Sequence, residues 1–63
     1  MAVASGDIRG IIDRLVVERQ SLRADGGDLA QLHANRLALA YWQLQLSRAL
    51  AAEALAREPA SAG

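Results

Sequence analysis

The segment Asp28–Arg57, DLAQLHANRLALAYWQLQLSRALAAEALAR, decides the fold, because it makes up almost half of the 63 residues. It contains neither Gly nor Pro and is rich in Leu, Ala, Gln and Arg, which all favour a helix. We predict a single helix over about 28–57, about 45 Å long at 1.5 Å per residue. The helix is expected to end before Pro59, since the residue preceding a proline is driven out of the helical region.

A turn precedes this helix. Asp25–Gly27 is typical of a helix end, with Gly26 free to adopt the left-handed conformation that terminates a helix. Asp28, followed three residues later by Gln31, has the pattern of a capping box at the next helix start. So short a turn, over 25–27, leaves the two flanking helices only an antiparallel arrangement.

A shorter helix is predicted over about 6–24, with Ser5 as its N-cap. The predicted fold class is therefore all-α: one antiparallel two-helix hairpin domain over 1–63, with a frayed tail at 58–63. The large apolar side chains of the first helix form a single stripe, made of Ile8, Ile11, Ile12, Leu15, Val16 and Leu22. Counting back from the turn pairs Leu22 with Leu32, Leu15 with Leu39, and Ile8 with Leu46.

The long helix has two rows of large apolar residues. The first is Leu29, Leu32, Leu39, Leu46 and Leu50, interrupted by Arg36 and Gln43; the second is Leu37, Tyr41, Leu44 and Leu55, interrupted by Arg48. Together they subtend roughly 220°, more than one neighbouring helix can cover. One row is expected to hold the first helix and the other a second copy, giving a dimeric four-helix bundle. The predicted self-association interface is Leu37, Tyr41, Leu44, Arg48, Leu50 and Leu55.

Trp42 projects beside Leu46 but outside the main apolar arc. It either folds over the rim of the bundle core or serves as an anchor for another protein, since Trp is enriched at binding hot spots. Small side chains make the back of this helix nearly smooth: Ala34, Ala38, Ala49, Ala52 and Ala56.

Catalytic and metal chemistry find little support in the sequence. The absence of cysteine excludes disulfides and thiolate zinc sites. His33, the single histidine, has no carboxylate three or four residues away to complete a metal pair. No arrangement around the serines resembles a nucleophile with its base. We therefore predict no catalytic residues, no metal and no cofactor, and a protein that is not an enzyme.

Charge also restricts the partners. Seven Arg balance seven Asp and Glu, so no net field attracts nucleic acid or an anionic membrane. Arg9, Arg19 and Arg23 nevertheless lie within about 80° of one another on the first helix and could contact nucleic acid in a dimer. No secretory signal or membrane-spanning run is visible, which predicts a cytoplasmic protein without membrane contact. The preference for Arg over Lys, with abundant Ala, indicates a GC-rich bacterial genome.

The sequence thus predicts a small protein–protein interaction module, an adaptor, regulator or accessory subunit, which binds itself and another protein. One alternative is a nucleic-acid-binding hairpin dimer of the plasmid or phage regulatory type. Another is an accessory subunit of a larger enzyme. The orientation of the two hairpins is open at this point.

Overall fold

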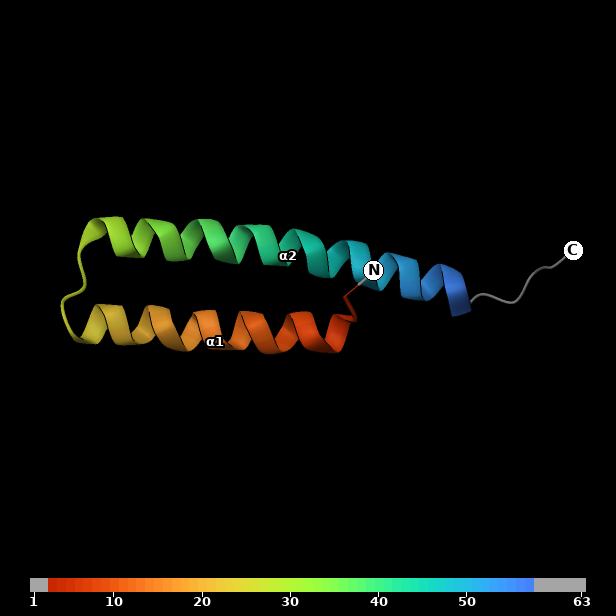
Figure 1. Ribbon diagram of the computed structural model, residues 1–63, viewed down its shortest axis with the longest axis horizontal. Coiled ribbons are helices and arrows are strands. Elements are labelled where there is room, and N and C mark those ends of the chain that lie inside the picture. The colour runs from red at the N-terminus through yellow and green to blue at the C-terminus, as the bar shows by residue number, and fades with distance from the viewer. Residues whose placement is uncertain (1–2, 58–63) are drawn as a thin grey trace, which may run out of the picture.

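The computed structural model describes residues 3–57, which form two helices joined by a short turn (Figure 1). Helix α1 comprises Ser5–Ala24, and helix α2 comprises Leu29–Arg57. They pack side by side in opposite directions, and α2 extends past the beginning of α1 because it has 29 residues against 20. The predicted all-α class with two packed helices is confirmed. The predicted tail at 58–63 lies outside the described residues.

The turn has the geometry that its sequence predicts. Gly26 has a φ of 73°, and the Gly27 N–H donates to the carbonyl of Leu22 at 2.6 Å, which together end α1 in a Schellman motif. A Cβ on Gly27 would lie only 2.7 Å from Cδ2 of Leu22, so a larger residue would collide there. Asp28 and Gln31 form a reciprocal capping box, with side chain-to-backbone bonds of 2.8 and 3.1 Å.

The beginning of α1 differs from the prediction. The N-cap is Ala4, whose side chain caps nothing, and Ser5 is the first helical residue, so the assignment of Ser5 as N-cap was wrong. The Ser5 N–H donates to Oε2 of Glu53 at 2.9 Å, and its hydroxyl donates to Oε1 at 2.8 Å. A carboxylate of α2 therefore satisfies a free N–H at the α1 terminus, where a local cap would otherwise be needed.

The face of α2 that α1 covers carries what we call the inner row. Its members are all buried or half-buried: Leu32, Asn35, Leu39, Trp42, Leu46, Ala49 and Glu53. Their intervals alternate between three and four residues, which is a heptad pattern. The facing row of α1 has the same spacing and is likewise buried or half-buried: Ser5, Ile8, Ile12, Leu15, Arg19 and Leu22.

This placement corrects the first predicted row of α2. Leu29 belongs to the first predicted row and Arg36 and Gln43 interrupt it, yet all three are exposed. Leu50 of the same row, which was also predicted at the self-association interface, is exposed as well. Val16 of the predicted α1 stripe is exposed as well. Leu32, Leu39 and Leu46 of the predicted row do face α1. The packed face is rotated away from the centre of the predicted row, because the hairpin also has to match polar groups. The inner row contains Asn35 and Glu53, both of which hydrogen bond to α1.

Asn35 crosses between the helices near the middle of their contact. Its side-chain amide donates to the carbonyl of Leu15 and to Oε2 of Glu18, each at 2.9 Å. Two buried atoms at this level, Oδ1 of Asn35 and Nη1 of Arg19, have no hydrogen-bond partner within the described chain. The bonds of Asn35 and of Glu53 agree with the register predicted from the turn, in which Leu15 lies opposite Leu39.

Candidate association surface

A second row of side chains follows α2 on the side away from α1, and we call it the outer row. Its members are all exposed: Ala30, Ala34, Leu37, Tyr41, Leu44, Arg48, Ala51 and Leu55. Their intervals alternate between four and three residues, so α2 carries two heptad patterns in one helix. At 100° per residue, the outer row is centred about 160° from the inner row. The helix therefore presents a second packing stripe to solvent.

The large members of the outer row are well exposed in one chain. The exposed fractions are 57% for Leu37, 55% for Tyr41, 50% for Leu44 and 72% for Leu55. Of the six residues predicted to form a self-association interface, Leu50 alone lies to one side of this row. The three alanines were missed as members of the row, although the four-three spacing that joins them to the leucines is present in the sequence.

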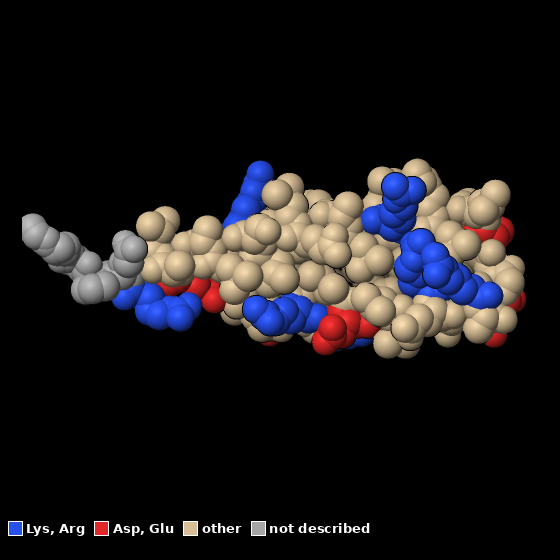
Figure 2. All heavy atoms as spheres, turned by 180° about the vertical axis from the view of Figure 1, so that it is seen from behind, with Lys and Arg blue, Asp and Glu red and all other residues tan. Residues whose placement is uncertain are grey.

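The outward faces of the two helices differ in charge. Six charged side chains of α1 are exposed: Asp7, Arg9, Asp13, Arg14, Glu18 and Arg23. By contrast, α2 has no charged residue between Arg36 and Arg48. Figure 2 shows acidic and basic atoms along the lower edge of the molecule and further basic side chains at its upper edge and over its right half, with uncharged atoms between them. A helix face without charge is unusual for solvent and suits a packed interface.

Tyr41 and Trp42 connect the two rows. Their ring centroids lie 5.1 Å apart at an interplanar angle of 89°, an edge-to-face contact. Trp42 is half-buried in the inner row, and Tyr41 is exposed in the outer row. The structure thus places Trp42, predicted either to fold over the rim of the core or to contact another protein, against α1.

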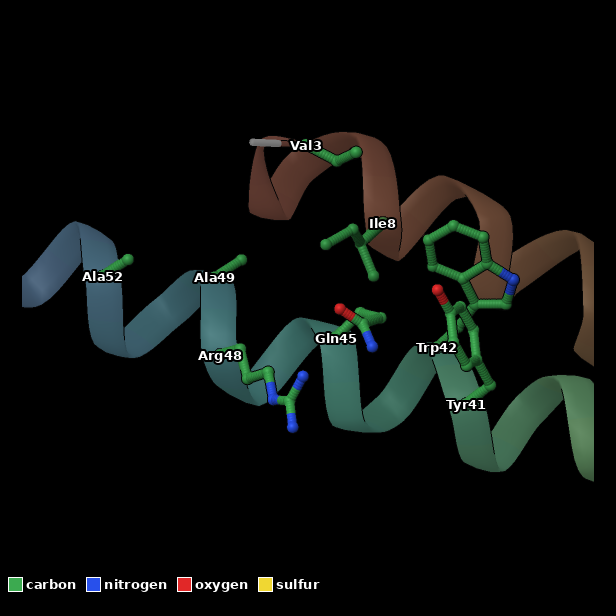
Figure 3. A pocket seen from close by; sticks show the side chains of 8 residues that line it. All are labelled: Val3, Ile8, Tyr41, Trp42, Gln45, Arg48, Ala49 and Ala52. Atoms are coloured by element: carbon green, nitrogen blue, oxygen red, sulfur yellow. The ribbon is translucent and has the colours of Figure 1, made fainter. Parts of the chain in front are cut away.

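A hollow of about 360 Å³ opens between the start of α1 and the middle of α2 (Figure 3). Ile8 and Val3 line it from the α1 side, and Trp42, Tyr41 and Arg48 are among the α2 residues around it. Its lining has no carboxylate, thiol or histidine. The hollow therefore offers apolar surface beside the guanidinium of Arg48 and the side chain of Tyr41.

The three arginines predicted as nucleic-acid contacts do not form one exposed patch. Arg19 belongs to the row of α1 that faces α2, and its Nη1 atom is buried. Arg9 and Arg23 are exposed, but they are separated by 14 positions, or about 21 Å along the helix. The arrangement therefore lacks the contiguous basic stripe that backbone phosphates favour.

The pKa of Glu53 is lowered by its contacts with the start of α1. The backbone N–H of Ser5, then its hydroxyl, lower the pKa of Glu53 below the ordinary carboxyl value, and the charges of Arg57 and Arg9 act in the same direction. Partial desolvation opposes them. The role of this group is structural, since its hydrogen bonds join α2 to the start of α1.

Residues 3–57 carry neither a metal-binding cluster nor a membrane-spanning helix. There, no three His, Cys, Asp or Glu side chains gather closely enough to hold a metal ion, and His33 is exposed. Neither α1 nor α2 combines the length and apolar character that crossing a membrane requires. Comparison of the chain with protein-family models, with curated proteins and with solved structures produced no match.

Proposed function

We propose that this protein is a small, non-enzymatic interaction module that associates with a second copy of itself through the outer row of α2. The observation that carries the proposal is the contrast in burial. In the described chain, Ile8 is the only fully buried apolar side chain, at 2% exposure, while four large outer-row side chains are at least half exposed.

The physical need for a partner follows from this thin core. Below about 70–80 residues a single core rarely provides more than a few kcal/mol, and natural chains of this size rely on disulfides, metals or oligomerisation. This chain has no cysteine. A second copy that covers the outer row would bury its leucines and tyrosine, and each side chain fully buried contributes about 1.5–3 kcal/mol.

Sedimentation equilibrium between about 1 and 100 μM tests the proposal, together with thermal unfolding followed by circular dichroism. A dimer is expected, with a melting temperature that rises with protein concentration, because association stabilises only the folded chain. A fully helical monomer throughout this range would contradict self-association. In that case, the outer row would have to serve a different protein, as in the accessory-subunit alternative.

The nucleic-acid alternative is tested by retention on heparin at low and moderate salt. Binding to phosphates weakens steeply with salt, in proportion to the number of phosphates contacted. We expect no retention at physiological salt, because the exposed arginines of α1 are interspersed with acidic side chains. Salt-sensitive retention that is lost when the exposed residues Arg9 and Arg23 are changed to Ala would support the alternative.

A further inference from the structure

We infer that the two copies associate back to back and antiparallel, α2 against α2, with a two-fold axis passing between positions 42 and 43. This inference rests on the proposed function and specifies the geometry of the same surface. In this arrangement Tyr41 lies opposite Leu44 of the second copy, Ala34 opposite Ala51, and Leu37 opposite Arg48.

The length of α2 selects this register. The helix is centred on position 43 of Leu29–Arg57, so a two-fold axis beside it overlaps two α2 helices along nearly their whole length. Every outer-row position then faces another outer-row position, including Ala30 against Leu55. Sliding one helix by a heptad, about 10 Å, would leave two outer-row positions of each copy without a facing residue.

The single charge in the outer row favours antiparallel over parallel pairing. In a parallel, in-register pair, Arg48 would face Arg48 of the second copy across an otherwise apolar contact. In the antiparallel register, Arg48 of the second copy faces Leu37 of the first. The two Arg48 side chains are then separated by the length of 11 residues, or about 16 Å along the helices. This separation exceeds the Debye length of about 8 Å at physiological ionic strength, so their repulsion is largely screened.

The positions that flank the outer row are uncharged and differ in size. On one side they alternate between Gln and Ala: Gln31, Ala38, Gln45 and Ala52. Antiparallel pairing places Gln31 beside Ala52 and Gln45 beside Ala38, so each longer side chain meets a small one. The two helices can then approach closely without like charges or two bulky side chains at the edge of the contact.

The angle between the inner and outer rows determines the position of α1 in the dimer. In a square four-helix bundle, a helix contacts its neighbours on faces about 90° apart. Here the inner and outer rows are about 160° apart, so the predicted four helices form a flat stack, with both α2 helices inside and both α1 helices outside. The charged faces of α1 then remain in solvent on opposite sides of the dimer.

Cysteine cross-linking tests this geometry, because the natural chain contains no cysteine. We would prepare Ala34→Cys, Ala51→Cys, and the double variant that carries both, and treat each with a bismaleimide that has a two-carbon spacer. Positions 34 and 51 of one helix are about 26 Å apart, too far for this reagent to join them within a chain. Only the double variant should form a covalent dimer. A second double variant, Ala34→Cys with Leu44→Cys, reports a register shifted by one heptad.

Each outcome decides one point. Covalent dimers from the double 34/51 variant alone support the antiparallel, fully overlapped pair. Self-linking of Ala34→Cys would indicate a parallel pair, and preferential linking of the 34/44 variant would indicate a shifted one; either result overturns the inference. Sedimentation equilibrium of the same variants separates this failure from that of the proposed function. A dimer in which the 34/51 variant does not link refutes only the geometry, whereas a monomer refutes self-association.

Discussion

The inner and outer rows of α2 each contain three leucines and one aromatic side chain, but they differ in burial and in how their polar groups are used. The inner row, which α1 covers, includes Asn35 and Glu53, whereas the outer row contains three leucines and a tyrosine, all at least half exposed. The polar residues of the inner row are used in hydrogen bonds to α1. The outer row has no buried polar side chain that needs a hydrogen-bond partner, and most of its residues are apolar.

This difference shows how a short hairpin can select one face for folding and leave another for association. Packing in a heptad pattern needs the right spacing, which both rows possess. What distinguishes the inner row is that its polar atoms meet partners on α1 at defined positions. Polar groups inside a helix pair can specify register at some cost in stability, and Asn35 is placed to do so.

Leu44→Glu in the outer row is expected to weaken the dimer more than any other substitution proposed. Each dimer would then bury two carboxylates, at a cost of about 2 kcal/mol each, or about 4 kcal/mol in total, so we expect the dimer Kd to rise about 1,000-fold. Sedimentation equilibrium measures the change. Val17→Glu on the charged face of α1, where Val17 is 62% exposed, is the matched control and should leave Kd unchanged. Equal effects of the two variants would refute an outer-row interface.

Ile8→Ala tests the inner contact. Removing a fully buried apolar side chain costs about 3 kcal/mol through lost burial and the cavity left behind. We expect a corresponding fall in the free energy of unfolding in urea, compared at one protein concentration. Val17→Ala should change it by less than about 0.5 kcal/mol. A loss below 1 kcal/mol for Ile8→Ala would mean that α1 and α2 pack differently.

Asn35→Leu sharpens the comparison by removing one of the two hydrogen-bonding polar side chains of the inner row that contact α1. Replacing a buried amide that is only partly satisfied by an apolar side chain of similar size should raise the stability by about 1 kcal/mol. Because the bonds to Leu15 and Glu18 are lost, the amide NMR spectrum is expected to broaden or double as other registers become populated. A more stable variant with one sharp set of resonances would show that Asn35 does not specify the register.

Glu53 is expected to have the smallest effect, which shows in how the stability changes with pH. Since folding lowers the pKa of Glu53, its contribution to stability is complete above the ordinary carboxyl pKa and is lost as the pH falls through the lowered value. Glu53→Gln should therefore weaken the fall in melting temperature between neutral pH and about pH 3. Ser5→Ala, which keeps the backbone N–H bond, should retain part of this dependence. An unchanged pH profile in Glu53→Gln would exclude a role for this contact in acid sensitivity.

Several features could be predicted because their causes are local. Gly26, Asp28 and Gln31 specify the turn through backbone conformation and capping bonds that involve a few neighbouring residues. The turn then determines that α1 and α2 run antiparallel. Counting residues from the turn in both directions predicts which positions of the two helices lie side by side. The exposed leucines at 37, 44 and 55 could likewise be placed in one row by their spacing.

The amino-acid sequence by itself determined two helices, their turn, their direction and a surplus of apolar surface on α2. Only the tertiary structure decided how α2 is rotated about its axis. That rotation depends on contacts between distant residues, with Asn35 bonded to Leu15 and Glu18, and Glu53 bonded to Ser5. A periodicity analysis ranks helix faces by hydrophobicity and contains no information about which polar atoms will meet across the pair.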